Sequence, residues 1–373
     1  MKTWRSYHLH SSDLDLLALG FVDPFLDRHR DSLDRCFWER HSAGGAHLRV
    51  RIEAEAETAA RVGAALEAEA ASFFKSHPSA DLSAAYSEES VRALLERENA
   101  SFCEDELVYR HDVAVQRSFP PEPLGYESEE AARFVWDFAH DSTPLMAAIL
   151  SDPRPKLELV LRLYFAHAAL AVGSVRAGSV SWRSHWEGFR SKMPSQEVLD
   201  RISAAYEEQR ELIHGHLVAV DAMATEDSWQ EDPILDGWKK LIRRYRQRVH
   251  QNLEAGHVFT QQPKSAEEAQ TMREDLEERL VRKSSFISTF WSNDRFLTSL
   301  GQDRRFQSPR ILVNLFYSMV ARVGVSPLQK MVFCHHVQRS VQEHFECDLL
   351  DQLSVNMANV VQRQSEARSS GAE

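Results

Sequence analysis

The sequence predicts an α+β fold, in which a small N-terminal layer of strands and helices precedes a mostly helical region. The first third of the chain mixes segments whose apolar residues alternate with segments of helical spacing. Three prolines within 119–125 then exclude both helix and sheet. Beyond that linker, almost every long segment has helical spacing. The predicted domains are therefore 1–125, an α+β region, and 126–373, a mostly helical region.

Three segments of the N-terminal layer have the alternating pattern of strands. They are residues 4–10, 47–52 and 107–113. The second follows Gly44 and Gly45, which mark a turn. Helical segments separate these strands, and that order is typical of a small α+β layer.

Two helices are predicted between the strands. Ser12 or Asp13 can cap a short helix, which must end before Pro24. The segment 53–75 is rich in Ala and Glu and has an apolar stripe, so it is predicted to be a longer helix.

The second domain is predicted to consist of helices. The glycine-containing segment 173–180 lacks the lysine of a phosphate-binding loop and is interpreted as a tight turn. The predicted helices are 128–142, 155–172, 196–220, 234–256, 266–289, 309–323 and 326–363.

Composition excludes several classes of function. The 373 residues include 44 Lys and Arg against 56 Asp and Glu, a net charge of −12, which argues against non-specific nucleic-acid binding. No apolar run of about 18 residues and no apolar signal core occur, so we expect neither membrane insertion nor export. Four cysteines without a CxxC pair predict a reducing, cytoplasmic location.

A cluster of histidine and cysteine near the C-terminus raises the question of a metal site. The cluster comprises Cys334, His335, His336, His344 and Cys347. On one helix, His336 and Cys347 would lie about 16 Å apart along the axis, too far to share an ion. Only His344 and Cys347 could meet at one metal, so no metal site is predicted.

One basic segment stands out in this acidic chain. Lys240, Arg243, Arg244 and Arg248 fall on one face of the helix predicted at 234–256. Such a face is either simply solvated or a docking surface for an acidic peptide segment.

The segment 179–189 holds Arg, Ser, His and Glu beside two tryptophans. Ser184 and Glu187 have the spacing of a capping box at a helix start. The string from Ser184 to Phe189, however, resembles the lantibiotic dehydratase C-terminal domain of the small-module type, the thiopeptide-type bacteriocin biosynthesis family. The openings at 4–9 and 47–51 and the late helix at 316–328 resemble the same family, so the resemblance extends from about residue 4 to 350.

This resemblance implies an elimination-domain-like fold, but one departure changes the implied reaction. Glutamate-eliminating members carry a catalytic histidine seven residues before the glycine of the late helix, and Tyr317 stands at that distance from Gly324. Ala321 also replaces the usual asparagine. A phenol of pKa about 10 is a poor base at neutral pH, although its hydroxyl both donates and accepts hydrogen bonds.

The resemblance therefore implies a thiopeptide pyridine synthase. Such an enzyme joins two dehydroalanines of a thiazole-containing precursor peptide in a formal [4+2] aza-cycloaddition, with loss of water and of the leader peptide. Neither a cofactor nor a metal is required. The implied partner is the modified ribosomal precursor peptide, and the sequence leaves open a homodimer and the identity of the thiopeptide.

The candidate site residues follow from these motifs. Each has a structural alternative: Tyr317 and Phe316 as packing residues, and Ser285 as a hydroxyl bonded to its own helix. The predicted catalytic residues are Tyr317, Ser285 and His185; the predicted substrate-binding residues are Arg183, Ser184, Phe286, Trp291, Phe316 and Arg322; the predicted leader-binding residues are Lys240, Arg243 and Arg244, together with the layer 1–125.

Two alternative functions remain open. One is elimination of glutamate from glutamylated Ser or Thr, for which Arg183 and Arg322 could hold the glutamyl carboxylate. The other is a non-catalytic module that recognises the leader peptide by adding it to an edge of the sheet.

Overall fold

The computed structural model describes residues 1–97, 104–119, 128–192, 195–257, 274, 284–291 and 304–370. The chain divides into two compact units. The first comprises Met1–Pro153 and Ser318–Gly324, and the second comprises Arg154–Tyr317 and Val325–Glu373. The linker predicted at 119–125 lies almost wholly outside the described residues, and the first unit extends beyond it to Pro153.

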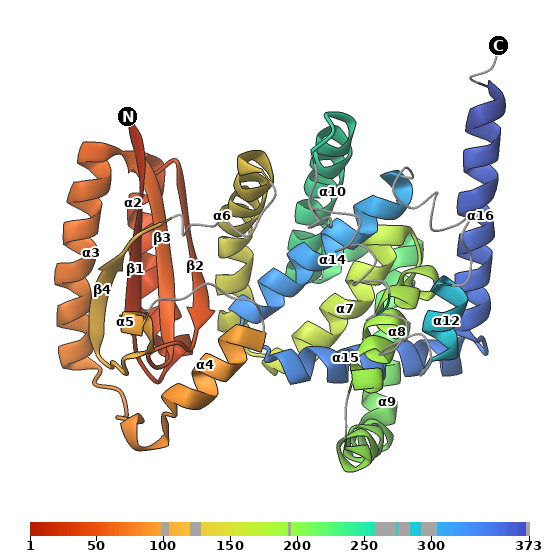
Figure 1. Ribbon diagram of the computed structural model, residues 1–373, viewed down its shortest axis with the longest axis horizontal. Coiled ribbons are helices and arrows are strands. Elements are labelled where there is room, and N and C mark those ends of the chain that lie inside the picture. The colour runs from red at the N-terminus through yellow and green to blue at the C-terminus, as the bar shows by residue number, and fades with distance from the viewer. Residues whose placement is uncertain are drawn as a thin grey trace. The chain divides into compact units, whose positions relative to one another are not determined.

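The first unit contains a four-stranded antiparallel sheet in the order β2-β3-β1-β4, which confirms the predicted α+β class (Figure 1). The strands predicted at 4–10 and 47–52 are present, whereas β2 was not predicted and residues 107–112 precede the fourth strand. The strands are β1 (Lys2–His10), β2 (Arg35–His41), β3 (His47–Glu55) and β4 (Val113–Arg117).

Helix α3 (Ala56–Ser76) confirms the helix predicted at 53–75 and packs against β1, β3 and β4. The approach to β1 is close, because a Cβ atom on Gly63 would lie 1.8 Å from the Tyr7 hydroxyl oxygen. Pro24 does not end the short helix as predicted. It lies in the first turn of α2, directly after the π-helical turn Ala18–Val22, so the helical run continues through it.

Helix α1 (Leu14–Leu17) continues through a π-helical turn, Ala18–Val22, into α2 (Asp23–His29). The short helices α4 (Glu88–Arg97) and α5 (Glu104–Leu107) follow α3.

Helix α6 (Glu129–Ser151) belongs to the first unit because it packs on β2. Phe37 of β2 forms a buried cluster with Ala132, Trp136 and Ala139 of α6. Arg35 adds an ion pair, with its Nε 2.5 Å from Asp137. The domain boundary predicted near 125 separates this helix from the sheet it covers.

The same face of the sheet carries four histidines, His8, His10, His41 and His47. Their rings are in contact, with centroids 4.8 Å apart for His8 and His47 and 4.5 Å for His10 and His47. Burial is the main cause that lowers the pKa of His10 to about 4 and of His41 to about 3, and it lowers the pKa of His8 and His47 as well. All four rings are therefore neutral near pH 7.

This cluster predicts an acid-sensitive fold. A histidine in the unfolded chain titrates near pH 6.5, above the folded values, so the unfolded state binds protons first as the pH falls. Stability should then be lost between about pH 6.5 and 4, at up to about 1.4 kcal/mol per pH unit for each buried ring. Melting temperatures measured across this range should fall steeply, and His41→Asn should flatten the slope. An equal slope in both proteins would exclude His41 as a contributor.

The second unit is helical. Segments predicted at 155–172, 196–220, 234–256 and 309–323 are confirmed, and 326–363 is two helices instead of one. The segment predicted at 266–289 lies almost wholly outside the described residues. The helices are α7 (Lys156–Val172), α8 (Val175–Lys192), α9 (Gln196–Glu226), α10 (Pro233–Glu254), α12 (Ser285–Trp291), α14 (Arg304–Arg322), α15 (Pro327–His344) and α16 (Leu349–Ser370). The last turn of α14, from Ser318 onward, belongs to the first unit.

Helices α7 and α8 cross closely. Gly173 ends α7 with a left-handed conformation at φ 107°, but 175–180 is the start of α8 and not part of a tight turn. A Cβ atom on Gly178 would lie 2.2 Å from the carbonyl oxygen of Ala168. Within the described part of the chain, no single helix is long and apolar enough to cross a membrane; α7 and α8 meet the criterion only as a pair bent by 113°.

Candidate functional site

Tyr317 of α14 lies at the centre of a polar cluster in the second unit. Its hydroxyl oxygen lies 2.8 Å from Nδ1 of His185 on α8 and 3.2 Å from Sγ of Cys334 on α15. Tyr317 and His185 are half-buried, whereas Cys334 is fully buried. The fold thus brings together two of the three predicted catalytic residues.

The three groups of this cluster are neutral near pH 7. Burial, followed by the charges of Arg310 and Lys330, lowers the pKa of His185 to about 4. Burial raises the pKa of the Tyr317 hydroxyl and raises that of Cys334 to about 12. A neutral phenol and a neutral imidazole can each give up one proton and accept another in the same step, so that neither group becomes a stable ion.

Lys330 and Arg310 are cations that the sequence reasoning missed. Nζ of Lys330 lies 5.5 Å from the centroid of the Tyr317 ring, a cation–π distance. Lys330 precedes Cys334 by one helical turn, so it shares the Cys334 side of α15. The spacing could have identified Lys330 as a site residue only after the contact between Cys334 and Tyr317 was known.

Two predicted substrate-binding aromatics are packing residues. Phe316 is fully buried, with its ring centroid 4.8 Å from that of Tyr164 and 4.7 Å from that of His167. Phe286 is also buried, in a cluster with Leu353 and Met357 of α16. Neither ring is accessible to a substrate, so both predictions are wrong. The side chain of Trp291 lies outside the described residues.

The structure places Ser284, not Ser285, against α8. The Ser284 hydroxyl is buried and donates to Oε2 of Glu187 at 2.9 Å. Ser285 is exposed in the first turn of α12. The catalytic role predicted for Ser285 therefore has no contact with the Tyr317 cluster to support it, and it stays a prediction.

Arg183 and Glu187 form an ion pair on α8, and the motif residue Glu187 was not predicted as a site residue. Nη2 of Arg183 lies 2.7 Å from Oε1 of Glu187, and its Nη1 donates to Oε1 of Gln338 at 3.0 Å. Ser184 is exposed in the middle of α8, so it caps no helix. The capping-box interpretation is wrong because the helix begins at Val175.

Arg322 does not face a substrate site. It is 2% exposed and lies in the first unit, where its Nε donates to the Trp38 carbonyl at 2.6 Å. Its two terminal nitrogens donate to Ala139 O, Ser142 Oγ and Thr143 Oγ1, at 2.9, 2.8 and 2.7 Å. These contacts join β2 to α6, so the prediction of substrate binding is wrong.

The basic face of α10 is exposed as the sequence indicates. Lys240, Arg243 and Arg244 are exposed. Lys240 pairs with Asp236 at 2.6 Å, and Arg243 lies 3.6 Å from Asp227. Leader binding at this face stays a prediction.

Over the part of the chain that the structure describes, no group of three or more His, Cys, Asp or Glu could hold a metal ion. The C-terminal histidines have other neighbours. Nδ1 of His335 lies 3.2 Å from Nδ1 of His336, and His344 contacts His214 at 2.9 Å.

Comparison with known proteins extends along most of the chain. A family model described as lantibiotic biosynthesis dehydratase C-term matches residues 4–341. The pyridine synthase TbtD from thiomuracin biosynthesis is similar in structure, with a TM-score of 0.70, 21% identity, and coverage of 91% of this chain and 98% of that chain. The structure of TsrL gives a TM-score of 0.68, 16% identity, and coverage of 94% and 97%. No curated protein matches the sequence.

Proposed function

Because the chain belongs to the lantibiotic biosynthesis dehydratase C-terminal family, we propose that it is a thiopeptide pyridine synthase. The substrate would be a dehydrated precursor peptide that carries thiazoles. The observation that carries the proposal is the hydrogen bond between Tyr317 and His185. Tyr317 stands at the position where glutamate-eliminating relatives would have a histidine. The fold shared with TbtD supports the same assignment.

The reaction needs a proton shift before the ring can close. One dehydroalanine supplies two carbons, and the other must form a 2-azadiene (C=N–C=C) with the amide carbonyl carbon of the preceding residue. That amide has to become an iminol, so its nitrogen loses a proton and its oxygen gains one. A bifunctional acid–base pair can make both transfers together.

Tyr317 and His185 can act as that pair. With Nδ1 of His185 accepting the Tyr317 proton, the Tyr317 oxygen can take the proton from the amide nitrogen. The Nε2–H of His185 then returns a proton to the amide oxygen, directly or through one water. The low pKa of His185, about 4, keeps an imidazolium from accumulating, so the transfers are expected to be concerted.

The rest of the reaction requires positioning more than strong catalysis. Holding the two alkenes in contact removes much of the entropic barrier to ring closure. The cations Arg310 and Lys330, whose charges act on His185, also favour electron density on the amide oxygen. Loss of water and of the leader peptide as a carboxamide then gives the aromatic pyridine.

Glutamate elimination is the second candidate, favoured by those two cations. Arg310 or Lys330 could hold a glutamyl carboxylate, a role that Arg322 cannot fill because its donors bond the first unit. Elimination also needs a general base, and the imidazole of His185 is a poor proton acceptor because its pKa is about 4.

Mass spectrometry distinguishes the candidates. The protein is incubated with a dehydrated, thiazole-containing precursor and, separately, with a glutamylated precursor. A pyridine synthase releases water and a leader carboxamide, and an eliminating lyase releases glutamate. If neither precursor changes mass while both bind, the chain is a recognition module and the proposal fails.

We also predict that the basic face of α10 contributes to leader binding. The double change Lys240→Glu and Arg243→Glu should weaken binding of an acidic leader peptide and flatten its salt dependence. Fluorescence anisotropy at two salt concentrations measures both effects. Arg201→Glu on α9, where the side chain is 76% exposed, is the matched control. Equal effects of the two variants would remove α10 from leader recognition.

A further inference from the structure

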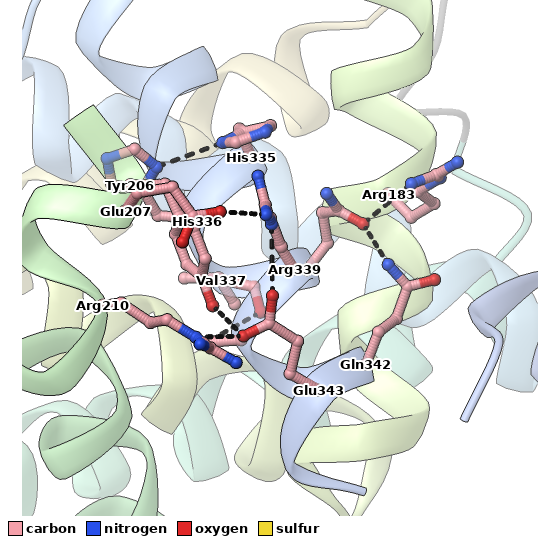
Figure 2. A network of polar contacts seen from close by, with 12 residues as sticks. Arg183, Tyr206, Glu207, Arg210, His335, His336, Val337, Arg339, Gln342 and Glu343 are labelled. Atoms are coloured by element: carbon pink, nitrogen blue, oxygen red, sulfur yellow. Dashed lines mark hydrogen bonds and ion pairs between the residues drawn. The ribbon is translucent and has the colours of Figure 1, made fainter. Parts of the chain in front are cut away.

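A separate cavity of about 650 Å³ lies in the second unit, lined by residues of α8, α9 and α15. Tyr317 and His185 are not among its lining residues, so it is distinct from the site proposed above. Its volume is in the range of small-ligand sites, about 300–1,000 Å³. Figure 2 shows a polar network that includes the lining residues Arg183, Arg339 and Gln342.

The α8 wall carries one net positive charge. Arg183 and Arg190 share the single carboxylate of Glu187, with each Nη2 2.7 Å from one of its oxygens. Glu187 is 1% exposed, and its Oε2 also accepts from Ser284. Two guanidiniums against one carboxylate leave a charge that a ligand anion can neutralise.

The charge of Arg339, which lines the cavity from α15, is balanced by carboxylates that do not line it. Arg339 lies beside Glu207 and donates to Oε1 of Glu343 at 3.2 Å (Figure 2). The other oxygen of Glu343 accepts from Tyr206 at 2.9 Å and from Arg210 at 2.8 Å. Two carboxylates thus offset two guanidiniums, and the unbalanced charge of the cavity is that of the α8 wall.

Arg190 and Gln338 offer hydrogen-bond donors to the cavity. Among the described residues, Arg190 makes contact through Nη2 alone, which leaves its Nε–H and Nη1–H groups; its side chain is 45% exposed. The side-chain oxygen of Gln338 already accepts from Arg183 and, at 2.8 Å, from Gln342, so its NH₂ group is what it can offer a ligand. Burial lowers the pKa of His335 to about 3, so this ring adds no charge.

These features specify the chemistry of the ligand. The donors call for an oxygen-rich acceptor, and the single unbalanced charge fits a carboxylate better than a phosphate dianion. Trp186 and Leu199 offer apolar surface to a methylene chain, while Gln196 and Ser203 can bond peptide amides.

We infer that this cavity binds the side-chain carboxylate of an acidic peptide segment, with Arg190 as its main anion contact. Such a peptide is the kind of partner that the proposed function requires, and the inference rests on that function only for the origin of the peptide. The site is separate from the exposed face of α10.

Binding to an inert probe tests the inference. The probes are a fluorescein-labelled decapeptide, blocked at both ends, with two glutamates, and the same peptide with two glutamines. Wild-type protein is expected to bind the glutamate peptide about tenfold more tightly, and Arg190→Gln should abolish that preference. Arg190 is a partly exposed side chain, so the variant is expected to fold, which the melting temperature checks.

One control and one competing variant locate the site. Arg201→Gln on α9 should keep the preference for glutamate, and the double α10 variant tests the basic face of α10 as the alternative site. Loss of the preference in the α10 variant with retention in Arg190→Gln would overturn the inference, as would equal binding of both peptides by wild type. Competition by free glutamate as strong as by the peptide would assign the cavity to the amino acid instead. Neither peptide can cyclise, so failure of the proposed reaction would leave these results unaffected.

Discussion

Tyr317→Phe is expected to slow pyridine formation by about 10²–10⁴-fold, the usual loss when one positioned proton-transfer group is removed. The variant keeps the ring beside Trp182 and Tyr164 but removes the hydroxyl that lies 2.8 Å from His185. Substrate affinity should change little, so the loss should appear in kcat and not in KM. Single-turnover conversion followed by mass spectrometry measures it.

The control for Tyr317→Phe is stability. Removing the hydroxyl leaves His185 and Cys334 without one partner each, which costs about 1–2 kcal/mol, so the variant should still fold. His185→Gln should slow the reaction to a similar extent if the two side chains act as one relay, and the double variant should be little worse than either. A wild-type rate in Tyr317→Phe would assign the tyrosine to packing alone.

Tyr317→His is the informative companion. It restores the residue of glutamate-eliminating relatives, yet we expect it neither to cyclise well nor to eliminate glutamate. The reason is that burial, together with the charges of Arg310 and Lys330, would lower the pKa of a second imidazole placed there, as it does for His185. Glutamate release by this variant would contradict the expectation and would favour glutamate elimination as the reaction that this site supports.

The sequence named Tyr317 and His185 as candidates but did not predict their contact or their surroundings. Tyr317 and His185 came from two motifs that lie 132 residues apart, and the fold places their polar atoms in contact. The same motifs also supplied Phe316 and Arg322, which pack or brace the fold. A family motif includes residues that the fold requires as well as residues that the chemistry requires. The motif alone therefore does not tell the two roles apart.

Register explains another part of what sequence reasoning missed. Ser284 and Ser285 are adjacent in the sequence, so their side chains point in different directions around the start of α12. This difference decides which hydroxyl is buried against Glu187. Strand β2 was missed because Cys36, Phe37 and Trp38 are buried in succession, which removes the alternation that identifies a strand. Helix α8 was missed because 173–180 was interpreted as a tight turn and Ser184 as a helix start, which divided one helix in two.

Arg322→Met is expected to lower the free energy of unfolding by about 3–5 kcal/mol, although the substitution removes no contact with a substrate. The guanidinium donates four hydrogen bonds, to acceptors on β2 and α6. Met fills most of the volume but donates nothing, so the buried carbonyl of Trp38 loses its side-chain donor. The hydroxyl of Thr143 suffers less, because it also donates to Ala139 O at 2.8 Å.

Hydrogen exchange locates the effect of Arg322→Met. Amides of β2 and α6 should exchange faster, whereas those of α7 and α9 in the second unit should be unchanged. Arg322→Lys is the matched variant: an ammonium keeps the charge and up to three donors, but it cannot reproduce the planar fork, so partial destabilisation is expected. A change within about 1 kcal/mol for Arg322→Met would mean that desolvating this guanidinium, whose pKa burial lowers to about 9, costs as much as its hydrogen bonds return.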